Sequence, residues 1–164
     1  MALSLISSAF KHNGTIPAKY TCDLPDGRQA GTQHISPPLT IAGVPETAKS
    51  LVLIMDDPDV PKQLRPEGVF DHWVVFNIPP DTTSIGEGGP VPGISGANGR
   101  GDAAYTGPCP PPEYEPREHR YVFKLYALNS LLSFGTGATK KEVLDALAPV
   151  RIEEAELIGR YSRK

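Results

Sequence analysis

The amino-acid sequence predicts a mainly β protein, an antiparallel β-sandwich with short helices near its C-terminal end. Apolar runs rich in β-branched and aromatic residues end at Asp, Pro or Asn-Ser, as strands do. These runs do not alternate with helical patterns, as they would in a parallel α/β sheet. The chain has 16 glycines and 18 prolines among 164 residues, which is typical of a protein with many turns. A chain of this length is expected to form a single domain over residues 1–164.

Strands are predicted from composition and from the turn residues that end each run. The strongest candidates read "SLVLIM", "HWVVFNI" and "HRYVFKLYAL", and two weaker ones read "LSLISSAF" and "PLTIAG". In order along the chain they cover residues 3–10, 38–43, 50–55, 72–78 and 119–128.

Strand alternation assigns the polar residues at the strand ends to faces. His119, Tyr121 and Phe123 share one face of their strand. By the same rule His72 lies on the same face as Val74 and Phe76. Polar residues above an apolar floor are typical of a small binding pocket.

Helices are predicted only at the C-terminal end. Thr139 with Glu142 three residues later forms a capping box, and Pro149 ends the helix. The stretch "IEEAELIGRY", residues 152–161, predicts a second short helix with Ile152, Ala155 and Ile158 inward. Both helices are expected to cover an edge or a face of the sheet.

Charge and composition exclude several classes of protein. The net charge is −3 and the basic residues are scattered, so no basic stripe suits nucleic acid. No run approaches the roughly 20 apolar residues of a membrane span, and the N-terminus is a poor signal peptide. We therefore expect a cytoplasmic protein that is not embedded in a membrane.

The two cysteines, Cys22 and Cys109, fit no metal-ligand spacing. A cytoplasmic location favours free thiols, although the cytosol of thermophiles is an exception. If the two cysteines pair, the long loop between them makes the bond worth roughly 4 kcal/mol in the chain-entropy model.

The acidic turn "MDDPDVPK", residues 55–62, follows a buried-looking strand and allows two interpretations. Its carboxylates could bond their own backbone amides in a simple turn. Alternatively, the prolines hold Asp57 away from helical geometry and against His72 or His119. A carboxylate beside an imidazole raises the histidine pKa and leaves a cation near neutral pH. With a tyrosine hydroxyl and loop amides, such a site suits phosphate, a carboxylate or a zwitterion.

No catalytic motif accompanies these residues. The sequence contains no nucleophile elbow, zinc-protease motif, phosphate-binding P-loop or dinucleotide fingerprint. Cys109 between prolines is better explained as a structural small hydrophobic residue than as a nucleophile. A divalent metal on Asp57, Asp59, His72 and His119 is a weaker alternative. The stretch "GPCPPP" predicts a stiff wall within the long loop-rich segment 81–118.

Five motifs occur in a fixed order: "SPPLTIAGVP", "DDPDVP", "HWVVFNIP", "YTGPCPP" and "HRYVFKLYAL". Together they resemble the phosphatidylethanolamine-binding protein family, the Raf-kinase-inhibitor-like group, in its prokaryotic branch. The resemblance runs from about Ile16 to Leu128. It implies a sandwich of antiparallel sheets with a small ligand pocket at one end, no cofactor and no established enzymatic reaction.

The resemblance also implies a ligand and a set of residues that bind it. The ligand would be a phosphate-like or phosphorylethanolamine-like anion, and protein partners would include a kinase or a serine protease. Some relatives form homodimers. The implied ligand-binding residues are Asp57, Asp59, Val60, Pro61, His72, Gly107, Pro108, His119 and Tyr121.

Two functions stay open beside anion binding: a serine protease inhibitor acting through the 107–117 segment, and a metal-dependent hydrolase. The chain departs from the family pattern near the expected pocket mouth in two places: Glu118 precedes "HRY" where relatives usually have a glycine nearby, and "GANGRGDAAYTG" lacks the aromatic residue that relatives often have before the pocket loop. Ligand size and partner surface are therefore not transferred from the family.

Overall fold

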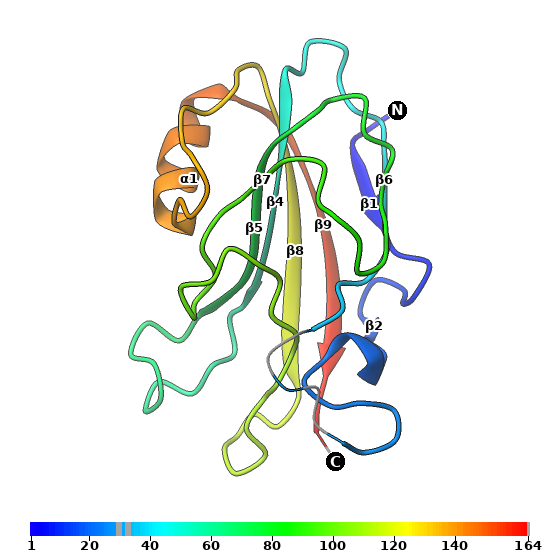
Figure 1. Ribbon diagram of the computed structural model, residues 1–164, viewed down its shortest axis with the longest axis vertical. Helices are drawn as coiled ribbons and strands as arrows, with labels where there is room; N and C mark the ends of the chain where they lie inside the picture. Colours follow the sequence, from blue (N-terminus) through cyan, green and yellow to red (C-terminus); the bar gives the residue numbers. More distant parts are fainter. Residues whose placement is uncertain (29–30, 32–33, 164) are drawn as a thin grey trace.

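The computed structural model describes residues 1–28, 31 and 34–163 and consists of two packed β-sheets with one short α-helix. The six-stranded sheet has the order β2-β9-β8-β4-β5-β7, and the three-stranded sheet has the order β1-β3-β6 (Figure 1). The strands are β1 (Ser4–Ile6), β2 (Gly14–Thr15), β3 (Leu39–Ala42), β4 (Ser50–Asp57), β5 (Phe70–Ile78), β6 (Ser84–Ile85), β7 (Ile94–Ser95), β8 (His119–Leu128) and β9 (Arg151–Tyr161). The helices are η1 (Ala18–Tyr20), α1 (Lys140–Leu147) and η2 (Ala148–Val150). The predicted mainly β fold is confirmed.

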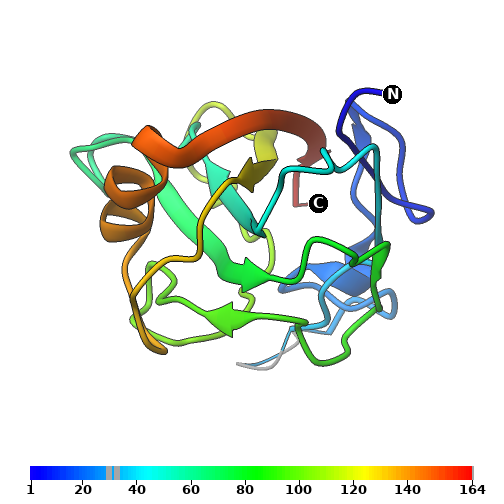
Figure 2. The same ribbon diagram turned by 90° about the horizontal axis from the view of Figure 1, so that it is seen from above.

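The large sheet is covered on both faces, which explains the unbroken apolar run of β4. Leu53 and Met55 point into the layer between the two sheets, together with Phe123. Val52 and Ile54 point the other way, into a second apolar layer beneath α1. Figure 2 shows the orange helix and the blue and green strands of the small sheet on opposite sides of the large sheet. A strand buried on both faces is expected to be apolar at consecutive positions.

Helix α1 begins as the sequence predicts. The Thr139 hydroxyl accepts from the Glu142 amide at 3.1 Å, and the Glu142 carboxylate accepts from the Thr139 amide at 3.0 Å. Val143 and Leu147 are buried against the sheet, and Pro149 lies in the 3-10 turn that follows. Among the helices of the described residues, none is long and apolar enough to cross a membrane.

The predicted second helix over 152–161 is wrong, because this segment is strand β9. β9 pairs antiparallel with β8 from His119↔Tyr161 to Leu128↔Arg151. Leu157 and Gly159 are buried, whereas Ile152, which the helical pattern places inward, is 37% exposed. The long edge of β8 offers a full row of hydrogen bonds, and this tertiary pairing outweighs the local helical pattern.

A bulge in β5 changes which residues face the interior at one end of the sheet. Met55 pairs with Trp73, but the next residue of β4, Asp56, pairs with Asp71, so His72 is an extra residue in β5. A bulge of this kind inverts the alternation of side chains beyond it. The prediction that His72 shares a face with Val74 and Phe76 is therefore wrong.

Candidate functional site

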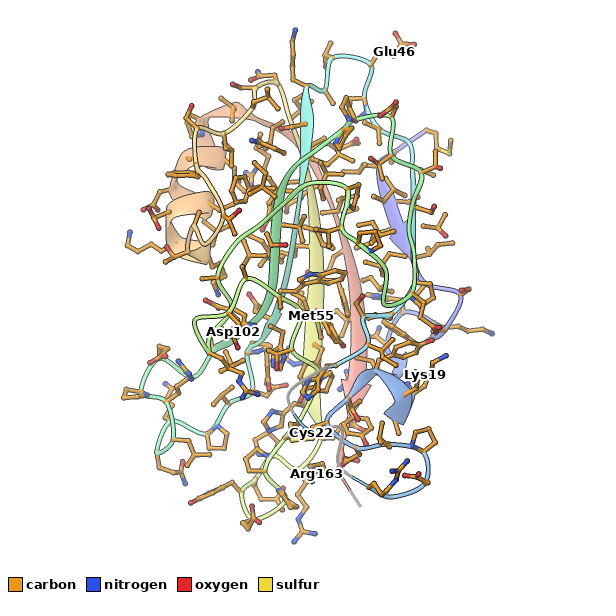
Figure 3. The ribbon with its side chains drawn as sticks, in the orientation of Figure 1. Lys19, Cys22, Glu46, Met55, Asp102 and Arg163 are labelled. Atoms are coloured by element: carbon orange, nitrogen blue, oxygen red, sulfur yellow. A yellow bond between two sulfur atoms is a disulfide. The ribbon has the colours of Figure 1, made fainter. Side chains whose placement is uncertain are left out.

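A pocket of about 430 Å³ lies at the end of the large sheet where β4 finishes and β5 and β8 begin. Because neighbouring strands are antiparallel, the C-terminal end of β4 meets the N-terminal ends of β5 and β8 at one edge. Figure 3 marks this end by Cys22, whereas Glu46 lies at the opposite end of the molecule. The lining residues are Cys22, Gly31, His34, Asp57, Val60, Phe70, His72, Arg100, Thr106, Gly107, Cys109, Pro110, Pro111 and His119.

A buried ion pair forms the floor of the pocket. His119 Nδ1 lies 2.6 Å from Asp57 Oδ2, and the two residues are 1% and 4% exposed. Burial alone lowers the pKa of His119, but the hydrogen bond and charge of Asp57, with the charge of Asp59, outweigh it and raise the pKa. The protonated form of His119 is therefore favoured in this pair. Asp57 Oδ1 also accepts from the Asp59 amide at 2.8 Å, so both sequence interpretations of the acidic turn hold.

His72 is a neutral imidazole in the same pocket. Its Nδ1–H donates to the Thr106 carbonyl oxygen over 2.7 Å. Burial lowers the pKa of His72 to about 4, and the hydrogen bond to Thr106 and the charges of Asp57 and Asp71 offset this only in part. Since Nδ1 carries the proton, Nε2 carries the lone pair. The sequence predicted His72 or His119 as the partner of Asp57, and the partner is His119.

Two buried polar atoms near the ion pair have no hydrogen-bond partner. Within the described residues, the buried side-chain atoms left unpaired are His119 Nε2 and the Tyr121 hydroxyl oxygen. The Tyr121 ring stands edge-on to His72 at 5.2 Å and stacks with His119 at 6.4 Å between centroids. Burial, and then the charge of Asp57, raise the pKa of Tyr121, so its hydroxyl keeps its proton. An unpaired buried polar atom is costly, which indicates a position that a ligand or water completes.

The wall of the pocket is a rigid pair of segments joined by a disulfide. Cys22 is bonded to Cys109, and the Cys22 amide donates to the Pro108 carbonyl oxygen over 3.0 Å. A Cβ atom at Gly107 would lie 2.9 Å from the Thr21 Cα atom, so only glycine permits this approach. The expectation of free thiols is wrong, because the fold brings the two segments, 87 positions apart in sequence, into direct hydrogen-bond contact.

Some of the predicted site residues lie outside the pocket lining. Asp59 forms two hydrogen bonds with the Arg120 guanidinium, at 2.8 and 3.0 Å, and these bonds lower the pKa of Asp59. Pro61, Pro108 and Tyr121 are also not among the residues that line the hollow. The predicted residues that line it are Asp57, Val60, His72, Gly107 and His119.

Sequence reasoning missed several residues of the lining. His34 and Arg100 lie in loops and belong to no recognised motif, so no sequence signal identified them. Phe70 stands edge-on to His72 with centroids 4.8 Å apart, and the bulge in β5 turns it toward the pocket. Within the described part of the chain, no group of three or more His, Cys, Asp or Glu side chains could hold a metal ion.

The two sheets and the pocket at one end define a β-sandwich protein with a small ligand-sized hollow. The family model described as Phosphatidylethanolamine-binding protein matches residues 6–162. A UPF0098 protein from Methanothermobacter thermautotrophicus is 44% identical over 98% of this chain and 99% of its own length. The chain belongs to the phosphatidylethanolamine-binding protein family, as the sequence motifs predicted.

Two solved structures are similar to this fold over almost the whole chain. A phosphatidylethanolamine-binding protein homologue from Chlamydia trachomatis, CT736, has a TM-score of 0.88 and 41% identity, and covers 99% of each chain. YbcL of Escherichia coli, described as a member of the mammalian family, has a TM-score of 0.83 and 26% identity over both full chains. Relatives of this chain are therefore present in both archaea and bacteria, and the two solved structures are bacterial.

Proposed function

We propose that this chain is a non-enzymatic binding protein that holds a small phosphate-like anion, such as phosphate or phosphorylethanolamine, in the pocket at the end of β4. The observation that carries the proposal is the buried pair of His119 and Asp57, in which His119 Nε2 has no partner within the described residues. The His119 imidazole is fixed by Asp57 and lines the hollow, so it offers a donor that an anion can accept from. The name of the family, after a phospholipid, agrees with this class of ligand.

The charges around the hollow favour a small anion over a neutral ligand. Asp57 and His119 neutralise each other, and Arg100 adds a positive charge to the lining. In the described part of the chain, no ion pair engages Arg100. A phosphate ester would meet Arg100 and the His119 ring, and the ammonium of phosphorylethanolamine would suit the Asp57 carboxylate.

Two features of the pocket support binding over catalysis. Cys109 is bonded to Cys22 and therefore offers no thiolate nucleophile. His72 is held neutral with its Nδ1–H on a carbonyl oxygen, and among the described residues no serine lines the pocket to form a nucleophile and base pair with it. The metal-dependent hydrolase receives no support, because Asp59 is bonded to Arg120 and does not line the pocket.

The protein partner, the oligomeric state and the cellular location stay predictions. A kinase, a serine protease and a second copy of the chain are the partners that the family resemblance suggests. The cytoplasmic prediction has to accommodate the Cys22–Cys109 disulfide, which is common in oxidising compartments and in the cytosol of thermophiles.

The proposal is tested by titration calorimetry of the purified protein with inorganic phosphate and with phosphorylethanolamine. Asp57→Asn keeps an oxygen for the Asp59 amide but removes the charge that raises the pKa of His119. We expect binding by the unaltered protein, a loss of at least about tenfold in Asp57→Asn, and no change in Glu46→Gln at the far end (Figure 3). Equal affinity in all three proteins, or no binding of either compound by the unaltered protein, overturns the proposal.

A further inference from the structure

A third histidine of the pocket, His34, occupies a backbone donor of the wall. The Gly107 amide donates to His34 Nδ1 over 2.6 Å. At the other side of the ring, Nε2–H donates to the Gly31 carbonyl oxygen over 3.1 Å. A backbone amide is always a donor, so Nδ1 must be the unprotonated nitrogen and Nε2 the protonated one. His34 is therefore held as a neutral ring in one tautomer.

The Gly107 amide is well placed to bind an anion. Gly107 and His34 line the same hollow as Asp57, His72 and His119. The wall that carries this amide is held by the Cys22–Cys109 disulfide and by the Cys22 amide on the Pro108 carbonyl oxygen. A backbone N–H on a rigid wall is a pre-organised donor for an oxyanion. In this structure the acceptor of that amide is His34 Nδ1.

We propose that His34 is an internal ligand of the Gly107 amide, that a bound anion displaces it, and that the imidazole takes up a proton as it is displaced. The proton comes from solvent and is added to Nδ1, whose lone pair the amide releases. Nδ1–H and the Gly107 N–H can then both donate to oxygens of the same anion. The inference rests on the proposed function, because it concerns the same pocket.

The groups around His34 explain why proton uptake and anion binding are coupled. Burial lowers the pKa of His34, the hydrogen bond to Gly31 opposes this, and the positive charge of Arg100 lowers the pKa again. His72 lines the same pocket and is neutral above its pKa of about 4, while the Thr106 hydroxyl lies 3.5 Å from His34 Nδ1. His119 and Asp57 form a closed pair in the same hollow. An anion beside the ring adds the negative charge that His34 lacks, which raises its pKa and favours protonation.

The coupling between proton uptake and anion binding predicts how the affinity for the anion changes with pH. If one proton is taken up for each anion bound, the affinity rises as pH falls, by at most about tenfold per pH unit. At alkaline pH, removal of His34 should instead strengthen binding, because the Gly107 amide is no longer engaged. The loss of one competing hydrogen bond corresponds to about fivefold in affinity.

The test uses sulfate, which is tetrahedral like phosphate and stays a dianion throughout the range, whereas a phosphate group changes charge near about pH 6. Affinity and the number of protons taken up are measured by calorimetry between about pH 5 and pH 8, in buffers of different ionisation enthalpy. The variant is His34→Ala. His12→Ala is a matched control, because His12 Nδ1 also accepts a backbone amide, that of Ile158 at 3.1 Å, but His12 does not line the pocket.

We expect sulfate to bind His34→Ala about fivefold more tightly at pH 8 than it binds the unaltered protein. We also expect the variant to lose the proton uptake that the unaltered protein and His12→Ala share. Identical pH profiles and proton counts in all three proteins overturn the role of His34 while leaving the proposed function intact. No sulfate or phosphate binding by any of them overturns the proposed function and the inference with it. Nitrogen chemical shifts of His34 in the free protein give a second check, since a protonated Nδ1 at pH 8 contradicts the internal ligand.

Discussion

The two faces of the large sheet hold neighbouring aspartates of β4 in opposite surroundings. Asp57 faces the pocket and bonds the buried His119 at 2.6 Å. Asp56 faces α1, where Lys140 Nζ lies 3.3 Å from Asp56 and 2.7 Å from Asp71. Burial raises the pKa of Asp56, and the charge of Lys140 opposes this. Burial lowers the pKa of Lys140, and the two carboxylates outweigh it and raise the pKa.

The difference lies in how completely the polar atoms are paired. On the face of the sheet that packs against α1, the Lys140 ammonium has three protons and contacts the carboxylates of Asp56 and Asp71. Both carboxylates are also partly exposed to water. On the pocket face, the ion pair is fully buried, yet His119 Nε2 and the Tyr121 hydroxyl have no partner among the described residues. A cluster that satisfies its own hydrogen bonds stabilises the fold. A buried cluster that leaves donors unpaired beside a hollow is the better candidate for binding.

The largest expected effect is on the wall of the pocket. Cys22→Ala combined with Cys109→Ala removes a bond that closes a loop of 87 positions. We expect the free energy of unfolding to fall by about 4 kcal/mol, measured by urea denaturation, because the unfolded chain regains the entropy of the open loop. Phosphate binding should weaken as well, since the segment that carries Gly107 is released. A change below about 1 kcal/mol contradicts the disulfide as a main support of this face.

The next effect compares the two aspartates directly. Asp57→Ala leaves the His119 imidazole buried without its partner, and we expect a loss of about 3 kcal/mol. Asp56→Ala leaves Lys140 paired with Asp71, so its expected loss is about 1 kcal/mol. Chemical denaturation of both variants at neutral pH measures the difference. Equal losses would remove the distinction between the faces.

The pH dependence of the free energy of unfolding tests whether His72 is neutral in the folded protein. The folded pKa of about 4 lies below the ordinary 6.5, so the unfolded chain binds more protons between these values. The stability that depends on neutral His72 is complete above about pH 6.5 and is lost as pH falls toward 4, by up to about 3 kcal/mol. His72→Asn keeps a donor for the Thr106 carbonyl and cannot titrate. Denaturation at several pH values should therefore show a shallower acid loss in His72→Asn, and identical curves would exclude a buried neutral His72.

The smallest expected effect is on the helix face. Lys140→Met keeps most of the apolar stem and removes the charge between Asp56 and Asp71. Because all three side chains are partly exposed, we expect a loss of about 1 kcal/mol in urea denaturation and an unchanged affinity for phosphate. Weaker phosphate binding in this variant would show that the two faces are coupled.

Local sequence signals located most of the strands and the start of α1. β4, β5 and β8 carry long runs of apolar and β-branched residues, and the capping box of Thr139 and Glu142 depends only on neighbours in sequence. The family motifs also identified Asp57, His72, Gly107 and His119, all of which line one pocket. These features are local, or are carried by motifs with a fixed order, and can be identified without coordinates.

Other features depend on contacts between distant segments, and sequence reasoning missed them. β9 is a strand because β8 offers it an edge, although its own pattern of Ile152, Ala155 and Ile158 fits a helix. The face of the sheet on which His72 lies depends on the bulge, where β5 has one residue more than β4. His34 belongs to no motif, and only the loop packing brings it to Gly107.

By itself, the sequence determined the class of fold, the family and the acidic turn that carries Asp57, because these depend on residue type and on neighbours along the chain. The tertiary structure alone decided which histidine pairs with a carboxylate, which is neutral and which holds the Gly107 amide. The three imidazoles are chemically identical, so their roles follow from burial and from the partner at Nδ1: a carboxylate for His119, a carbonyl oxygen for His72 and a backbone amide for His34. Long-range packing sets those partners, and no local pattern encodes them.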